Sequence, residues 1–174
     1  MGLNAHRTAL ISGANRGIGA AVAKRLFDAG WAVSLGMRAP EMPGWANAAP
    51  ERVHLFAYEA TQADAGTSWA SEVTDRFGRI DAVVANAGIM IPETIVDVSD
   101  ADMAQLLEIN VQAPRRLAAA CWDVLGAAGN GRVILLGSLS GKRVKSAKSG
   151  SYSVSKFAVI GMAHALRHAG FDKG

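Results

Sequence analysis

Two side chains suited to acid–base chemistry stand four residues apart near the C-terminal end of the sequence. Tyr152 and Lys156 belong to the segment Tyr-Ser-Val-Ser-Lys, and in a helix this spacing places both on one face, one turn apart. A phenol titrates near a pH of about 10 in water, but a neighbouring ammonium group favours the phenolate. Such a pair can exchange a proton with a substrate oxygen, although exposed helices also carry Tyr–Lys pairs by chance.

A hydroxyl group that could assist this pair precedes Tyr152 by fourteen residues. Ser138 follows the apolar run 133–136, within the segment Gly-Ser-Leu-Ser-Gly. Ligands bind beyond the carboxyl ends of strands in open parallel sheets. A hydroxyl group there can hydrogen-bond a substrate oxygen whose charge changes during the reaction. Ser140 is the alternative donor in the same segment.

A glycine-rich segment near the N-terminus lies between an apolar run and a helical pattern. Residues 12–19 read Ser-Gly-Ala-Asn-Arg-Gly-Ile-Gly. Glycines let the backbone turn tightly and approach a pyrophosphate, and the following helix N-terminus offers free N–H groups to the anion. Glycines also punctuate ordinary turns, but this position between a strand and a helix favours dinucleotide binding. The predicted cofactor-binding residues of the segment are Gly13, Asn15, Arg16, Gly17, Ile18 and Gly19.

The end of the second apolar run bears on which dinucleotide is bound. NAD sites usually hold a carboxylate about 20 residues beyond the glycines, bonded to the ribose 2′-hydroxyl. Residues 34–38 contain no acid and end in Arg38, which can pair with a 2′-phosphate through two parallel hydrogen bonds. Arg16 offers a second positive charge. The sequence therefore predicts NADP(H) as the preferred cofactor, with NAD(H) as the alternative, unless both arginines are merely solvated surface charges.

Together these motifs resemble the short-chain dehydrogenase/reductase family, in its compact branch with Gly-x3-Gly-x-Gly and Tyr-x3-Lys. The resemblance extends from Ala9 to about Gly170. It implies an oxidoreductase that transfers a hydride between NADP(H) and a small alcohol or carbonyl substrate. In the roles that the resemblance implies, Tyr152 is the general acid/base and Ser138 orients the carbonyl. Lys156 lowers the pKa of Tyr152 and holds the nicotinamide ribose, and both Tyr152 and Lys156 are expected to contact the cofactor.

The resemblance also implies roles for residues that would otherwise attract little attention. The segment Asn86-Ala87-Gly88 matches a family motif that stabilises the sheet beside the cofactor, where an Asn side chain can tie neighbouring strands together. By itself it could be a simple turn. Glu59 stands where the family has an Asp that meets the adenine. Asn110 resembles a fourth catalytic residue, which orders a water linking the lysine to solvent; the alternative is an Asn that bonds its own helix backbone.

Short apolar runs alternate with helical patterns along the whole sequence. This alternation predicts a doubly wound parallel α/β sheet, a three-layer Rossmann fold, in a single domain over residues 1–174. The stretch 39–50, with three prolines, is expected to be a loop. The predicted strands cover residues 8–12, 32–36, 53–58, 82–85 and 133–136, and the predicted helices cover residues 18–29, 63–77, 100–125 and 152–169.

The composition limits the class of protein and its partners. Half of the 174 residues are hydrophobic and 19% are charged, as in a compact folded chain. A net charge of +3 is too small to indicate nucleic-acid binding. The single cysteine excludes an internal disulfide, and no metal site is expected. With no long apolar run and no signal peptide, we expect no membrane partner and a cytoplasmic location.

The sequence stops at Gly174, just after the helix expected to carry Tyr152. The resemblance implies a further strand, a substrate-covering loop and a last strand, so we expect the C-terminal part of the family fold to be missing here, either because the chain is shortened or because the sequence is part of a longer protein. If those segments are absent, the fifth strand should be an exposed edge. Family resemblance also suggests a homodimer or homotetramer joined through the long helices. The alternative to an enzyme is a catalytically silent NADP(H)-binding sensor or assembly subunit.

Overall fold

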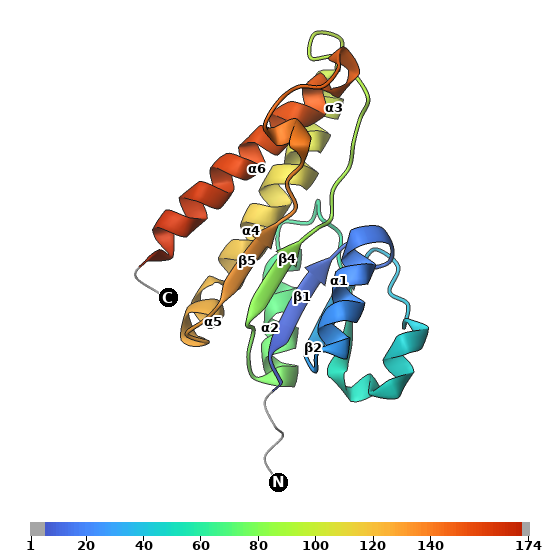
Figure 1. Ribbon diagram of the computed structural model, residues 1–174, viewed down its shortest axis with the longest axis vertical. Coiled ribbons are helices and arrows are strands. Elements are labelled where there is room, and N and C mark those ends of the chain that lie inside the picture. Colours follow the sequence, from blue (N-terminus) through green and yellow to red (C-terminus); the bar gives the residue numbers. More distant parts are fainter. Residues whose placement is uncertain (1–5, 172–174) are drawn as a thin grey trace.

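The computed structural model describes residues 6–171, in which five parallel strands form one sheet (Figure 1). The order across the sheet is β3-β2-β1-β4-β5, so the chain starts in the middle and builds outward on both sides. This arrangement confirms the predicted doubly wound parallel sheet. The strands are β1 (Thr8–Ser12), β2 (Ala32–Met37), β3 (Val53–Ala57), β4 (Ala82–Ala85) and β5 (Arg132–Leu135).

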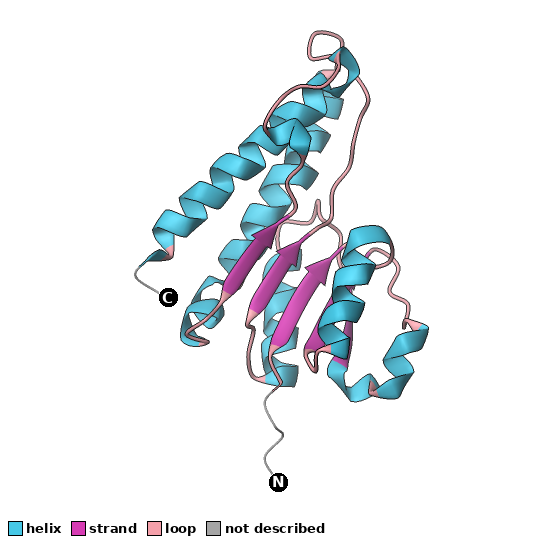
Figure 2. Ribbon diagram, in the orientation of Figure 1, coloured by secondary structure: helices cyan, strands magenta, loops and turns pink. Residues whose placement is uncertain are grey.

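Helices cover both faces of the sheet (Figure 2). On one face α1 contributes Ala23 and Phe27 to a buried cluster with strand residues such as Ile11. On the other face Trp69 of α2 and Leu117 of α4 pack on the opposite side of the strands. The helices are α1 (Gly17–Asp28), α2 (Ala65–Phe77), α3 (Asp100–Leu107), α4 (Ala113–Ala120), α5 (Trp122–Ala127) and α6 (Gly150–Ala169).

The helix predicted over residues 100–125 is interrupted, which corrects the sequence-based expectation. A π-helix, Glu108–Gln112, separates α3 from α4, and Cys121 separates α4 from α5. Pro114 supplies a physical reason for the first break. It has no N–H to donate to the Asn110 carbonyl, and in a regular α-helix its ring would clash with that carbonyl. The expected loop 39–50 also differs, because it contains the short 3-10 helix Gly44–Ala48.

Strand β5 lies at one edge of the sheet and pairs with β4 on its other side. Ile134 within it is 49% exposed, whereas every residue of β1 is buried. In the part of the chain that the structure describes, the expected exposed edge is therefore present. Across these same residues, none of the helices combines the length and apolarity that a membrane crossing requires.

The carboxyl ends of the parallel strands meet at one edge of the sheet, and α6 begins beyond that edge (Figure 1). The loop after β4 is joined there to the start of α6. The Ser151 hydroxyl donates hydrogen bonds to the carbonyls of Ile91 and Glu93, at 3.3 and 3.1 Å. Gly150 packs so closely on Ile95 that an added Cβ would lie 3.1 Å from its backbone nitrogen. These contacts fix the first turn of α6, which carries Tyr152.

Candidate active site

The glycine turn after β1 requires glycine at three positions. Gly13 and Gly17 have positive φ angles of 68° and 58°, in the left-handed region that disfavours side chains. Gly19 lies in α1 beneath the turn, and an added Cβ there would collide with the Gly13 carbonyl. The Gly13 N–H donates to the Gly36 carbonyl at 2.8 Å, which anchors the turn to β2. The backbone therefore presents a bare, closely packed surface at the N-terminus of α1.

Asn86 ties the end of β4 to this turn. Its Nδ2 group donates to the carbonyls of Ser12 and Gly13 at 3.0 and 3.1 Å. The Ser12 hydroxyl oxygen in turn accepts from the backbone N–H groups of Asn86 and Ala87, both at 3.0 Å. The amide side chain thus joins the two central strands at the point where the strand order reverses, which is where ligands bind in open α/β sheets.

A cavity of about 910 Å³ opens at this point, bounded by the glycine turn and the ends of β2, β3 and β4. Of the predicted cofactor-binding residues, nine line it: Gly13, Asn15, Arg16, Gly17, Arg38, Glu59, Asn86, Ala87 and Gly88.

Four predicted cofactor-binding residues do not line this cavity: Ile18 and Gly19 of the turn, and Tyr152 and Lys156 of α6. Ile18 is 62% exposed on α1, and Gly19 is buried under the turn. Sequence reasoning also missed several larger side chains in the wall, among them Tyr58 and Ile109. Tyr58 ends a strand pattern like any core residue, and Ile109 lies in the unpredicted π-helix, so only the folded chain reveals them as cavity residues.

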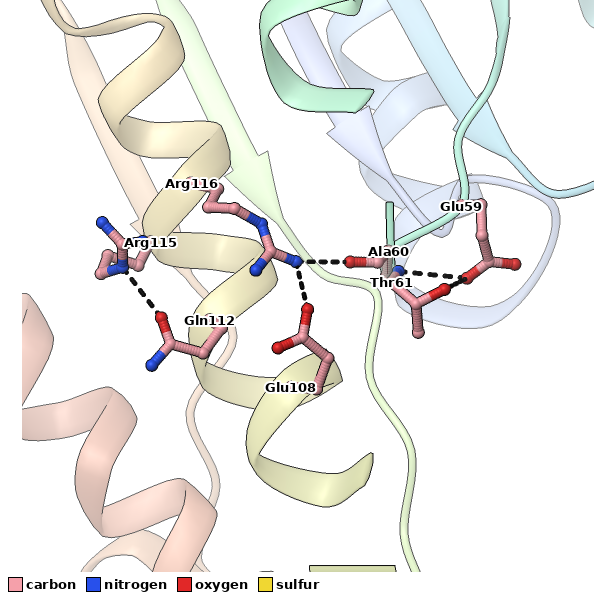
Figure 3. A network of polar contacts seen from close by, with 7 residues as sticks. All are labelled: Glu59, Ala60, Thr61, Glu108, Gln112, Arg115 and Arg116. Carbon is pink, nitrogen blue, oxygen red and sulfur yellow. Dashed lines mark hydrogen bonds and ion pairs between the residues drawn. The ribbon is translucent and has the colours of Figure 1, made fainter. Parts of the chain in front are cut away.

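The charged groups at the rim of the cavity differ in how they are held. The side chains of Arg16 and Arg38 are exposed, and within residues 6–171 neither side chain makes a hydrogen bond or an ion pair. Glu59 is held by its own turn, because its Oε1 accepts from the N–H and hydroxyl groups of Thr61 at 3.2 and 3.1 Å (Figure 3). The rim therefore offers two guanidinium groups that a bound anion could use without breaking a protein contact.

Lys156 and Tyr152 lie together on α6, as their spacing predicts. Lys156 is only 7% exposed, and its Nζ donates to the Leu136 carbonyl at 2.7 Å. The same Nζ lies 5.7 Å from the centre of the Tyr152 ring. Burial lowers the pKa of Lys156, because removal of water penalises its charged form. Tyr152 is half-buried. The ammonium group is thereby fixed between the end of β5 and the phenol.

Ser138 lies just beyond β5 and is half-buried, whereas Ser140 is buried. The Ser138 oxygen accepts from the Ser140 N–H at 3.1 Å at the start of the 3-10 helix Leu139–Gly141, which leaves the hydroxyl hydrogen free to donate. Gly141 packs against α6 so tightly that an added Cβ would lie 2.6 Å from the Lys156 carbonyl oxygen. The segment that carries Ser138 is thus packed directly on the helix of Tyr152 and Lys156. Because Ser138 is more exposed than Ser140, it is the better candidate to contact a substrate.

Asn110 is 1% exposed in the middle of the π-helix. Its Oδ1 accepts from the Ile89 N–H and its Nδ2 donates to the Ile89 carbonyl, both at 2.9 Å. The same Nδ2 donates to the Ser155 hydroxyl at 3.0 Å, and that hydroxyl donates to the Tyr152 carbonyl at 2.7 Å. The alternative in which Asn110 bonds its own helix backbone is therefore wrong. Its side chain joins Ile89, in the segment after β4 that lines the cavity (the cavity loop), to the turn of α6 that carries Tyr152.

Comparison with known proteins gives consistent matches across the chain. A family model described as short chain dehydrogenase matches residues 7–174. Agropine synthesis reductase from Rhizobium rhizogenes is 34% identical over 167 residues, which is 95% of this chain and 39% of that protein.

Two solved structures extend this likeness to the fold. A short-chain dehydrogenase from Streptomyces avermitilis has a TM-score of 0.91 at 26% identity, over 98% of this chain and 63% of that one. A metagenomic short-chain oxidoreductase in complex with NADP has a TM-score of 0.83 at 27% identity, over 96% of this chain and 76% of that one. The chain thus spans less than two thirds of both the agropine synthesis reductase and the Streptomyces enzyme.

Proposed function

The chain belongs to the short-chain dehydrogenase family, and we propose that it transfers a hydride between NADP(H) and a small alcohol or carbonyl compound. The observation that carries the proposal is the buried Lys156 ammonium group, held 5.7 Å from the Tyr152 ring centre at the carboxyl edge of the sheet. A buried charge costs folding free energy unless a charged partner and hydrogen bonds offset it, and within residues 6–171 the only hydrogen bond of this group is to the Leu136 carbonyl. Beside a phenol at a ligand-binding edge, the use that fits is proton transfer.

The residues present fit a dinucleotide. Glycine is required where a Cβ would fill the turn, the helix N-terminus favours an anion, and the cavity borders both strand β2 and strand β4. When bound, the nicotinamide would supply or accept the hydride. Gly13, Gly17 and the N-terminus of α1 would hold the pyrophosphate.

The chain's own side chains would manage the proton and the substrate oxygen. Tyr152 would donate its hydroxyl proton to the carbonyl oxygen in reduction and recover it in oxidation. Lys156 would favour the phenolate through its nearby positive charge. Ser138 would donate a hydrogen bond to the same substrate oxygen as negative charge develops. Asn110 would hold the Ser155 turn, and with it Tyr152, against the cavity loop.

Preference for NADP(H) over NAD(H) is part of the proposal. It is supported by the two unpaired guanidinium groups of Arg16 and Arg38 at the rim, and by the absence of an acid at residues 34–38. The NADP complex of the metagenomic relative agrees with this preference. A 2′-phosphate would gain charge-assisted hydrogen bonds that a 2′-hydroxyl cannot form.

The test is a dinucleotide titration of the intact protein, followed by rate measurements against a panel of ketones, aldehydes and alcohols. We expect NADPH to bind and at least one carbonyl compound to be reduced. Tyr152→Phe should lower kcat at least about 100-fold, because one acid–base group contributes about 100-fold to 10,000-fold to the rate. The affinity for NADPH should change little. Binding without turnover would instead favour the silent sensor or assembly subunit, and a fully active Tyr152→Phe variant would overturn the mechanism.

A further inference from the structure

Arg116 of α4 lies between two parts of the candidate site that are far apart in the sequence (Figure 3). Its Nη2 donates to the Ala60 carbonyl at 2.9 Å, across a separation of 56 residues. The same nitrogen pairs with Oε1 of Glu108, the first residue of the π-helix. The side chain is only 20% exposed. Because the Arg116 side chain is largely shielded from water, its pair with Glu108 differs from a solvated surface ion pair. The same guanidinium group also bonds a second, separate element.

The Ala60 contact reaches the cofactor side of the site. Ala60 and its neighbours Tyr58 and Glu59 line the cavity, and they belong to the turn that follows β3. Burial raises the pKa of Tyr58 to about 12, while the positive charge of Arg116 acts in the opposite direction. Arg116 thus holds the part of the cavity wall that follows β3.

The Glu108 contact reaches the catalytic side. Glu108 and Arg116 are eight residues apart, so in a helix their backbones differ by about 12 Å along the axis. The long Arg side chain closes this gap by leaning toward the helix N-terminus, the direction that helical side chains favour. The ion pair therefore spans the whole π-helix, which contains Ile109 of the cavity wall and Asn110.

We infer that Arg116 is a positioning residue that keeps the β3-side wall of the dinucleotide cavity in register with the π-helix that holds Asn110. The inference rests on the proposed function, since it concerns the same cavity. Its two contacts have separable effects. The bond to Ala60 shapes the cavity and acts on dinucleotide affinity, whereas the pair with Glu108 fixes the π-helix and acts on turnover through Asn110 and Tyr152.

Arg115 provides a matched control. It is the neighbouring arginine on the same helix, it is exposed, and its Nε donates to the side chain of Gln112, the last residue of the π-helix, at 3.0 Å (Figure 3). Arg115→Met is the same chemical change as Arg116→Met: each replaces a charged arginine by an uncharged, unbranched side chain. It leaves untouched the contacts between the cavity wall and the π-helix.

The experiment uses the intact protein and four variants: Arg116→Met, Arg116→Lys, Glu108→Gln and Arg115→Met. Dissociation constants are measured for NADPH and for reduced nicotinamide mononucleotide, which lacks the adenosine half. We expect Arg116→Met to weaken NADPH about tenfold, the size of one lost charge-assisted hydrogen bond, and to leave the mononucleotide unchanged. Glu108→Gln should lower kcat with little effect on NADPH affinity, Arg116→Lys should recover part of both losses, and Arg115→Met should match the unaltered protein.

Several outcomes would overturn the inference. Equal NADPH dissociation constants for Arg116→Met and Arg115→Met would end it, as would an equal loss of affinity for the mononucleotide. Thermal unfolding confirms that each variant is folded at the assay temperature. If Arg116→Met does not fold, Arg116→Lys and Glu108→Gln decide the matter by the same affinity and kcat criteria. Failure of the unaltered protein to bind any dinucleotide would overturn the proposed function and this inference together, whereas normal binding with insensitive variants would overturn the inference alone.

Discussion

Arg38 stands exposed where β2 ends, at the rim of the dinucleotide cavity. If it pairs with a 2′-phosphate, its loss should affect NADPH and spare NADH, which has only a hydroxyl group there. We expect Arg38→Gln to lower kcat/KM for NADPH about tenfold to 100-fold, and to change the value for NADH less than about twofold. Initial rates with both cofactors test this.

A suitable control is Arg25→Gln, which removes an exposed arginine near the C-terminal end of α1, away from the carboxyl ends of the strands where the cavity lies. It should change neither rate. An equal fall with NADPH and NADH in the Arg38 variant would mean that Arg38 supports the cavity in general and does not select the phosphate.

Lys156 links the chemistry of the site to the pH dependence of folding. Its pKa in the folded chain lies below the ordinary value of 10.5, because burial disfavours the ammonium form. Between these two values the unfolded chain holds a proton that the folded chain has released, so this group makes the folded state more stable as the pH rises through that window. At lower pH both states are protonated, and the full cost of burying the charge remains.

Lys156→Met should abolish turnover and remove this contribution. Urea denaturation of both proteins between about pH 8 and about pH 10 measures the difference in unfolding free energy across the window. We expect the unfolding free energy of the unaltered protein to increase relative to that of Lys156→Met as the pH rises. A difference that stays constant would show that the folded and unfolded pKa values of Lys156 are the same.

At the scale of elements, the π-helix Glu108–Gln112 is held by bonds from its side chains to other segments. Asn110→Ala would remove three hydrogen bonds and leave the N–H and carbonyl of the half-buried Ile89 without these partners. We expect the unfolding free energy to fall by about 2–4 kcal/mol, measured by urea denaturation. Ser155→Ala removes the Asn110 contact but spares both Ile89 bonds, so it should cost less. An equal loss in the two variants would contradict the bridging role of Asn110.

The strands were predictable from sequence because short apolar runs bounded by glycine or polar residues fix them locally. The predictions for β1 and β4 match at both ends, and those for β2, β3 and β5 differ by one residue at one or both ends. The glycine turn and the Tyr152–Lys156 pair were also predictable, because helical spacing alone brings the latter together. Pro114 is a local signal for a break in the predicted helix 100–125, but the bonds of Asn110 were not predictable. Its partners, Ile89 and Ser155, lie 21 and 45 residues from Asn110, so no local pattern signals them.

Arg116 shows the same limit from another direction. In the sequence it is one of two adjacent arginines, and nothing in their spacing distinguishes them. The fold turns one toward Ala60 and Glu108 and the other toward Gln112 (Figure 3). Residues that act by joining distant segments become visible only when those segments have been brought together.

For the molecule as a whole, the cavity lies where the two halves of the sheet meet. Its walls come from β1, β2 and β3 on one side, through Gly13, Arg38 and Glu59, and from the segments after β4 and α3 on the other, through Asn86 and Ile109. A ligand that contacts both halves binds the folded chain and not the unfolded one. Bound ligand should therefore stabilise both halves together, as one cooperative unit.

NADPH should accordingly raise the temperature of thermal unfolding. At a free concentration of about 100 times its dissociation constant, a ligand adds about 2.7 kcal/mol to the stability of the folded state. For a domain of this size that corresponds to a rise in Tm of about 5–10 °C. NADH at the same concentration should give a smaller rise, because it lacks the 2′-phosphate that Arg16 and Arg38 would hold. Thermal unfolding followed by circular dichroism measures both shifts. Equal shifts would contradict the preference for NADP(H), and no shift with either would mean that the cavity between the two halves does not hold a dinucleotide.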